Sequence, residues 1–180
     1  INDIEVETNS IVDEYIKKAD FKKFVAFGKS IEYCHKLKES FNRKGVVCHV
    51  IDQSVKDSDR RETLEKLKSG LIKGVISVEI LTTGFDEPSI ECVILANLSS
   101  SIKKYIQCCG RGIRLHPGKE KCILLDFYGN IELHGMPDDR LKITKKTKFS
   151  KVVDRVLKLD EISIDSEIIE RELKEQKVIY

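Results

Sequence analysis

The sequence lacks the long apolar segment of a membrane-spanning chain and the large net charge that would favour a highly charged partner. No apolar run reaches the ~18 residues of a membrane-spanning helix, and no signal peptide is present. The 180 residues carry a net charge of only +2, so charge alone does not indicate nucleic acid. There is no aromatic-rich patch for stacking bases. Because the sequence begins at Ile1 rather than at Met, we expect a fragment or a processed product.

The cysteines lack the C-x-x-C spacing of zinc and redox sites. Six are present, mostly in apolar segments, at positions 34, 48, 92, 108, 109 and 122. Thiols in such surroundings are typical of a reducing compartment and not of a disulfide framework. We therefore expect buried free thiols, no metal site and a cytoplasmic protein.

The stretch VAFGKSIEYC, residues 25–34, resembles the end of a phosphate-binding loop but lacks the beginning of one. In the P-loop pattern G-x-x-x-x-G-K-[ST], the first glycine opens the ring of backbone N–H groups that holds the phosphates. The letters GKS at 28–30 fit, but Lys23 stands where the first glycine is needed. Residues 24–27 are typical of a buried strand instead. The chain therefore has no complete phosphate-binding loop of its own.

Short apolar runs rich in Val and Ile recur along the chain and predict strands. They cover residues 24–27, 46–51, 74–78, 92–96 and 122–125. Because polar and apolar residues do not alternate within them, these strands fit a parallel sheet that is covered on both faces. In such sheets the ligand crevice lies at the carboxyl ends of the strands, which here means the loops after residues 78, 96 and 125.

Helical patterns separate the strands. They cover residues 10–19, 30–44, 57–69 and 101–109. Ser30 is the expected N-cap of the second pattern, and Gly45 and Gly70 are expected just beyond the ends of the second and third. Strands that alternate with helices of this length predict an α/β fold with helices on both faces of a parallel sheet.

Two arginines stand out in QCCGRGIRLHPGK, residues 107–119. Gln107 lies off the apolar stripe of the preceding helix, and Gly110 would permit close backbone approach. If the helical turn continues, Arg111 and Arg114 project to the same side and form a clamp for a multiply charged oxyanion. The alternative is a surface helix end that binds nothing. These residues alone do not decide between the two.

A second polar stretch, VEILTTGFDEPSI, follows an apolar run at residues 78–90. Thr82 and Thr83 offer hydroxyls, Gly84 permits a turn, and Asp86 can accept a hydrogen bond from a hydroxyl such as that of a ribose. The Asp-Glu pair follows a turn and not an apolar strand, so it does not fit a metal-holding pair. Taken alone, the stretch also fits an ordinary loop with a glycine turn.

Together the two stretches resemble a known family. The order T-x-G-x-D and then Q-x-x-G-R-x-x-R resembles motifs V and VI of superfamily-two helicases, and the first strand with GKS falls where motif IV falls. The resemblance covers roughly residues 10–135 and implies a RecA-like fold. EILTTGFDEP, GRGIRLHPGK and CILLDFYGNIELHG are most similar to the RadD branch, which is related to the helicase subunits of type I and type III restriction enzymes.

The resemblance implies roles for individual residues. In this family ATP with Mg²⁺ is bound mainly by a first RecA-like domain, and the second domain supplies arginines. Arg111 and Arg114 would reach the γ-phosphate, and Gln107 would lie at the domain interface. The positions implied at the nucleotide side of the cleft are Gly84, Asp86 and Gly110. Those implied for contact with the nucleic-acid backbone are Thr82, Thr83, Lys29 and Ser30.

The resemblance also implies a domain plan and partners. Residues 1–20 would be a lead-in and linker helix, 21–135 the second RecA-like domain, and 136–180 a charged, helical extension. The partners would be DNA, with RNA as the alternative left open, and the first RecA-like domain of the same protein. We therefore expect the chain alone to be inactive as an ATPase. Asp126, Asn130 and His134 match a branch signature with no evident role, and residues 140–158 form either a solvated face or a basic edge that tracks phosphates.

Two other functions remain open from the sequence. The chain could be a nucleic-acid-binding module with a degenerate motor, working through its basic segment at 140–158. It could instead be a small flavodoxin-like α/β enzyme with its own phosphate site at Arg111. An upstream region without a P-loop would favour the first, and binding of phosphate esters by the isolated chain would favour the second.

Overall fold

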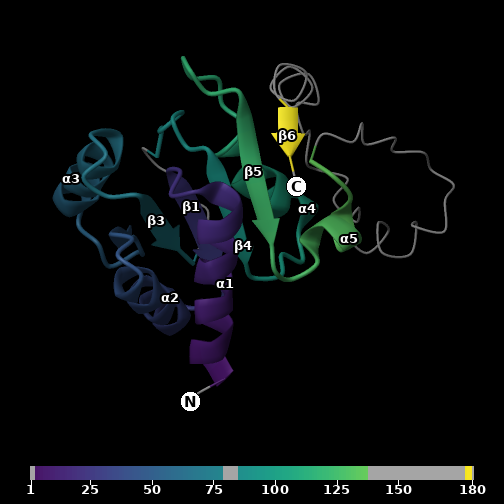
Figure 1. Ribbon diagram of the computed structural model, residues 1–180, viewed down its shortest axis with the longest axis horizontal. Coiled ribbons are helices and arrows are strands. Elements are labelled where there is room, and N and C mark those ends of the chain that lie inside the picture. The colour runs from purple at the N-terminus through teal and green to yellow at the C-terminus, as the bar shows by residue number, and fades with distance from the viewer. Residues whose placement is uncertain (1–2, 79–84, 138–176, 180) are drawn as a thin grey trace, which may run out of the picture.

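The computed structural model describes residues 3–78, 85–137 and 177–179. Its centre is a parallel sheet in the order β2-β3-β1-β4-β5-β6 (Figure 1). The strands are β1 Phe24–Gly28, β2 Cys48–Val50, β3 Gly74–Ser77, β4 Cys92–Ala96, β5 Lys121–Asp126 and β6 Lys177–Ile179. The five strands expected from the apolar runs are confirmed, and so is the α/β, RecA-like class with a parallel sheet between helices.

Helices cover both faces of the sheet, as a continuous apolar strand pattern requires. They are α1 Asp3–Ala19, α2 Ile31–Arg43, α3 Asp57–Lys68, α4 Ile102–Gly110 and α5 Asn130–His134. Alternate strand residues face opposite layers. Ala26 and Ile94 belong to a buried cluster with α1 and α2, whereas Val25 and Val93 belong to a second buried cluster with α3 and α4. Figure 1 shows α1 lying across the sheet beside α2 and β5.

Local signals fix the helix ends. The Ser30 hydroxyl accepts a hydrogen bond from the Tyr33 N–H at 3.1 Å, which confirms the expected N-cap of α2. Gly45 and Gly70 follow the C-caps of α2 and α3 with φ of +76° and +81°, a region that favours glycine, so both expected stops are confirmed.

Two expected elements differ from the structure. The first helix begins at Asp3 and not near Ser10, because Ile4 and Thr8 continue its inward stripe through a segment that is otherwise polar. The short helix α5 was not expected, since five residues carry no periodic pattern. Of the helical extension expected at 136–180, only 136–137 and 177–179 lie within the described residues, and 177–179 form β6 and not helix.

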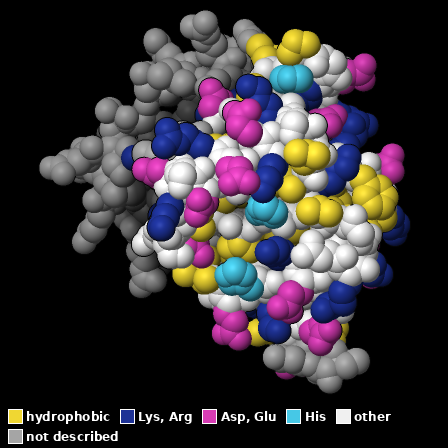
Figure 2. Space-filling model, turned by 90° about the vertical axis from the view of Figure 1, so that its left-hand side faces the viewer, with side chains coloured by type: hydrophobic (Ala, Val, Ile, Leu, Met, Phe, Trp, Pro, Cys, Tyr) yellow, Lys and Arg dark blue, Asp and Glu magenta, His cyan; other side chains and the backbone are white. Residues whose placement is uncertain are grey.

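Neither the charge pattern of the surface shown in Figure 2 nor the length of the described helices indicates a particular class of protein. On the face shown in Figure 2, basic and acidic side chains are interspersed with hydrophobic ones, and no patch of a single charge dominates its described part. None of the helices in the described ranges is long and apolar enough to cross a bilayer.

Candidate functional site

The two polar stretches singled out in the sequence meet in the structure. Helix α4 ends at Gly110, and Arg111 caps it in a helical conformation. The Arg111 guanidinium donates a hydrogen bond from Nη1 to the Phe85 carbonyl oxygen at 3.0 Å. After one further turn, Arg114 forms an ion pair with the Asp86 carboxylate. The loop at 111–114 therefore lies against residues 85–86, and both guanidinium groups sit at this contact.

The ion pair between Arg114 and Asp86 is exposed on one side. The Asp86 side chain is 80% exposed and that of Arg114 is 31% exposed. Exposed pairs of this kind contribute about 0–1 kcal/mol to stability. Arg114 can therefore exchange the carboxylate for another oxyanion at small cost, and Asp86 can accept from another donor.

The two glycines of this loop have different surroundings. A Cβ at Gly110 would meet nothing within 4 Å among the described residues, so no described part of this chain packs against the Gly110 backbone. A Cβ at Gly112 would lie 2.3 Å from Cys122 Sγ and 2.5 Å from Val93 Cγ2. Gly112, not Gly110, lets the loop pack on the sheet, whereas Gly110 leaves open space at the end of α4.

Helix α4 presents a row of polar side chains. Lys104, Gln107 and Arg111 recur at i, i+3 and i+7 and therefore share one side of the helix. Lys104 and Gln107 are exposed. Gln107 lies off the buried stripe, as expected from the sequence. Lys104 was missed, although its spacing of seven residues before Arg111 was a usable signal.

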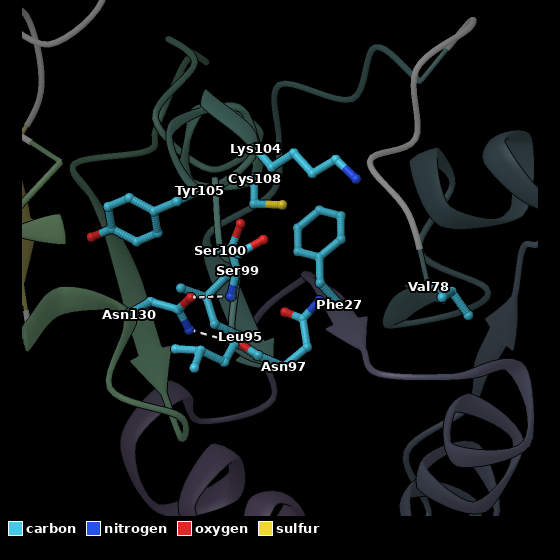
Figure 3. A pocket seen from close by; sticks show the side chains of 11 residues that line it. Phe27, Val78, Leu95, Asn97, Ser99, Ser100, Lys104, Tyr105, Cys108 and Asn130 are labelled. Atoms are coloured by element: carbon cyan, nitrogen blue, oxygen red, sulfur yellow. Dashed lines mark hydrogen bonds between the residues drawn. The ribbon is translucent and has the colours of Figure 1, made fainter. Parts of the chain in front are cut away.

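The expected crevice at the carboxyl ends of the strands is present as a cavity of about 250 Å³ (Figure 3). Its wall is apolar near Phe27 and Leu95 and polar along the loop after β4. The remaining lining residues are Val78, Asn97, Leu98, Ser99, Ser100, Lys104, Tyr105, Cys108 and Asn130. The arginines are not part of this lining. Helix α4 starts at the cavity and runs back towards the start of the next parallel strand, which carries Arg111 to the other end of the helix.

Asn130, one of the three signature residues noted in the sequence, lies on the rim of this cavity. Asn130 is buried, with 1% of its surface exposed. Its Oδ1 accepts from the Ser99 N–H at 2.8 Å, and its Nδ2 donates to the Asn97 carbonyl oxygen at 2.8 Å and to Asp126 Oδ1 at 2.9 Å. Figure 3 shows the amide turned toward this loop. Asn130 therefore fastens the loop that leads into α4.

The other two signature residues support the same loop. Asp126 Oδ2 accepts from the Ile131 N–H at 2.7 Å, which holds the start of α5 against the end of β5. His134 Nε2 lies 2.6 Å from the Ser99 carbonyl oxygen, and its ring stacks on Tyr105 with centroids 5.2 Å apart. No role for these residues could be predicted from the sequence, because their partners are mainly backbone atoms.

Two residues expected at the nucleic acid already have partners within the chain. Lys29 Nζ lies 3.1 Å from Glu7 Oε2 and donates to the Tyr128 hydroxyl at 2.9 Å, and Tyr33 donates to Glu7 Oε1 at 2.8 Å. Burial acts to raise the pKa of Glu7, but hydrogen bonds from Tyr128, Tyr33 and Lys29 outweigh it and lower the pKa. Ser30 caps α2. This cluster of Glu7, Lys29, Tyr33 and Tyr128 joins α1 to the turns after β1 and β5.

The remaining expected site residues follow β3 in the sequence. Thr82, Thr83 and Gly84 lie outside the described residues. The Glu87 carboxylate is buried and accepts from the N–H and the hydroxyl of Ser89, so it closes its own turn. Within the described ranges, no group of three or more His, Cys, Asp or Glu side chains is placed to hold a metal ion.

These residues fit one side of a nucleotide site. Arg111, Arg114 and Lys104 are donors suited to phosphate oxygens, and the exposed Asp86 is an acceptor suited to a hydroxyl. A P-loop and a carboxylate pair for Mg²⁺ have no counterpart in the described part of the chain. A nucleotide with its metal would therefore need a second protein surface opposite the arginines.

Comparison with known proteins identifies the family. The sequence profile described as "Helicase conserved C-terminal domain" matches residues 7–116, more than half of the chain. Over 122 residues the chain is 30% identical to a protein of Saccharomyces cerevisiae described as "Putative ATP-dependent helicase IRC3". That alignment covers 66% of this chain but only 18% of the yeast protein. The chain thus corresponds to a minor part of such a relative.

Solved structures share the fold. The C-terminal domain of S. cerevisiae Dbp5, solved bound to Gle1, superimposes with a TM-score of 0.59 at 15% identity, covering 94% of this chain and 93% of that one. A fragment of a putative HsdR subunit of a type I restriction enzyme from Vibrio vulnificus gives 0.58 at 19% identity, over 75% of this chain and 30% of that one. At these identities the likeness concerns the fold alone. The profile match over residues 7–116 identifies the family: the chain belongs to the helicase conserved C-terminal domain family.

Proposed function

We propose that this chain is the second motor domain of an ATP-dependent DNA helicase or translocase. The observation that carries the proposal is the contact between the loop at 111–114 and residues 85–86, which sets two guanidinium groups beside an exposed carboxylate. We call Arg111, Arg114 and Asp86 together the half-site. The chain that carries this half-site has no P-loop. We assign residues 21–135 to the motor domain, 1–20 to a linker helix and 136–180 to an extension.

The half-site works when a first RecA-like domain closes on it. ATP with Mg²⁺ bound on that domain supplies the phosphoryl group whose charge spreads over its oxygens during transfer. Arg111, which the Phe85 carbonyl anchors, would place its guanidinium beside that charge. Arg114 exchanges Asp86 for a phosphate oxygen, and Asp86 becomes available to a ribose hydroxyl. Because the clamp is complete only after closure, the chain alone should not hydrolyse ATP.

The remaining motif residues are candidates for coupling between the two domains and for contact with the nucleic acid. Gln107 and Gly110 face open space at the end of α4, where the first domain would dock. Thr82, Thr83, Lys29 and Ser30 are the candidates for contact with the phosphodiester backbone. Contacts of that type carry no base information, so we expect little sequence preference.

The choice of DNA rests on the branch signature. Asp126, Asn130 and His134 lie in the stretch that resembles the RadD and type III restriction branch, and all three hold the cavity rim by hydrogen bonds. We propose this branch for the chain, and with it DNA as the substrate. A reducing, cytoplasmic setting fits the six free thiols.

The test measures ATP hydrolysis by the full-length protein with and without DNA, in the parent and in the Arg111→Lys and Arg111→Ala variants. We expect turnover to be stimulated by DNA and to fall about 10³-fold or more in Arg111→Ala, with ATP binding largely retained. Arg111→Lys keeps the charge but loses the fork of donors, and should fall almost as far.

A matched control and two contrary outcomes complete the test. Lys103→Ala removes a positive charge from an exposed position on the same helix and should leave turnover unchanged. If Arg111→Ala hydrolyses ATP as fast as the parent, Arg111 does not act on the phosphoryl group. If the parent itself shows no turnover but binds DNA, the chain is a binding module with a degenerate motor, and residues 140–158 become its candidate contact.

A further inference from the structure

Lys119 follows the loop at 111–114, which we call the arginine loop. Its contacts are unusual for a lysine. It is half-buried, and its ammonium lies within hydrogen-bond reach of three main-chain carbonyl oxygens. Nζ donates to the Arg114 carbonyl at 2.9 Å, to the Pro88 carbonyl at 3.1 Å and to the Gly112 carbonyl. An ammonium has three N–H donors, so each can serve one of these acceptors.

The three acceptors belong to the two loops that build the half-site. Gly112 and Arg114 lie on either side of the buried Ile113 in the arginine loop. Pro88 lies in the loop that also carries the Phe85 carbonyl and Asp86. One cation therefore spans the same two loops that the arginines bridge.

The surroundings of Lys119 disfavour its positive charge. Burial lowers the pKa of Lys119, and the nearby Arg114 lowers it further, whereas Cys122 and Glu91 act in the opposite direction. A half-buried ammonium is stabilised when its donors are satisfied by well-placed acceptors. The three carbonyl oxygens accept hydrogen bonds from the Lys119 ammonium. They can all do so only while the two loops stay together.

We infer that Lys119 is a positioning residue for ATP hydrolysis, which holds the arginine loop in register with residues 85–88 so that Arg111 and Arg114 meet the transferring phosphoryl group. The inference rests on the proposed function and assigns Lys119 no contact with the nucleotide. Because in-line phosphoryl transfer depends on placement of charge, a shift of about 1 Å in the arginines can reduce the rate about 10²-fold.

The experiment compares Lys119→Met with Lys121→Met in the full-length protein, with ATP hydrolysis measured at saturating DNA. Methionine keeps the apolar length of the side chain and removes all three donors. Lys121 is two residues away and exposed, so its variant controls for loss of charge. We expect kcat of Lys119→Met to fall about 10–100-fold while the Kd for ATP and the affinity for DNA change less than about three-fold. Lys121→Met should match the parent.

A double-variant cycle separates positioning from a general structural role. If Lys119 acts through the arginine, Lys119→Met should add less than about three-fold to the loss already caused by Arg111→Ala, because coupled residues are not additive. A purely structural role would instead lower the melting temperature and reduce the active fraction equally in both backgrounds. That result would overturn the inference.

Further outcomes keep this inference distinct from the proposed function. If Arg111→Ala abolishes turnover but Lys119→Met keeps kcat within two-fold, the positioning role is wrong and the motor assignment stands. If Arg111→Ala has no effect, the motor assignment fails and this inference fails with it. Should Lys119→Met not fold, Lys119→Gln retains a shorter amide donor. A several-fold loss of its kcat at an unchanged melting temperature supports the role, and an unchanged kcat overturns it.

Discussion

Gly110 and Gly112 stand two positions apart and have opposite surroundings, which gives a matched pair of substitutions. In Gly112→Ala the new Cβ would meet Cys122 Sγ and Val93 Cγ2, both on buried side chains, at 2.3 and 2.5 Å, so the loop or these side chains must shift. We expect the free energy of unfolding of the chain to fall by about 1–3 kcal/mol. Urea denaturation of the parent and the variant measures the difference.

Gly110→Ala is the control for that substitution. Its Cβ meets nothing within 4 Å among the described residues, and alanine favours a helical position over glycine by up to about 1 kcal/mol. We expect stability to be unchanged or slightly higher. Equal destabilisation by the two substitutions would contradict the packing described at Gly112. A stable Gly110→Ala protein with impaired ATP turnover would place Gly110 at the domain interface.

Some of the half-site could be predicted from single residues, and some could not. Arg111, Arg114 and Asp86 were predicted because charged side chains at motif spacing are visible in a sequence, and the structure brings their loops together. Lys119 and Asn130 were not predicted as anchors because their partners are largely carbonyl oxygens and N–H groups. Every residue carries such groups, so no spacing reveals which of them a side chain will reach.

The elements were predicted where their pattern was long or unbroken. Strands buried on both faces read as continuous apolar runs, so all five were found, and capping residues marked both ends of α2. The first seven residues of α1 were missed because acidic and polar residues separate Ile4, Thr8 and Ile11, although these recur at helical spacing. Helix α5 depends on tertiary contacts through Asn130 that no local pattern contains.

Helix α1 is tied to its neighbours by the cluster of Glu7, Lys29, Tyr33 and Tyr128, and this tie should depend on pH. The hydrogen bonds to Glu7 outweigh its burial and lower its pKa below the ordinary value of 4.5. A lowered carboxyl pKa contributes stability that is present above the unfolded-state pKa and is lost as pH falls through the folded-state pKa. The contacts of the Glu7 carboxylate are therefore intact above pH 5, and they weaken as the pH falls below about 4.5.

The matching experiment compares the melting temperatures of the parent and Glu7→Gln between pH 3 and pH 7. At neutral pH we expect Glu7→Gln to lose on the order of 1 kcal/mol, a figure that allows for the partial exposure of Glu7. The difference between the two proteins should shrink as Glu7 is protonated at low pH. Glu32→Gln, at an exposed position on α2, serves as control. A gap that stays constant across this range would show that the Glu7 charge does not support α1.

Taken together, the layers explain how the proposed half-site is held in place. Helix α4 is fastened at its start by Asn130 and at its end by the loop that Lys119 spans. Between these points it packs on the sheet through Tyr105 and Cys109. The arginines are therefore carried on a supported element, which is the arrangement that electrostatic stabilisation of a transition state needs.

The same layered core should protect every thiol in the molecule. Three of the six cysteines lie on strands between the helix layers, and the other three face inward from α2 and α4. Burial raises the pKa of Cys34, Cys48 and Cys108 to about 12 and that of Cys122 to about 11, and raises those of Cys92 and Cys109 well above their ordinary value. Because the thiolate is the reactive form, all six should be inert near neutral pH.

Alkylation of the 180-residue chain by iodoacetamide at pH 8, followed by mass spectrometry, measures this protection. In native buffer we expect no cysteine to be modified on the timescale that alkylates all six in concentrated urea, because reaction must wait for unfolding. Cys108 lines the cavity and is the most exposed of the six at 7%, so any local opening near α4 should appear there first. Rapid native modification of Cys92, at the centre of the sheet, would contradict the layered core itself.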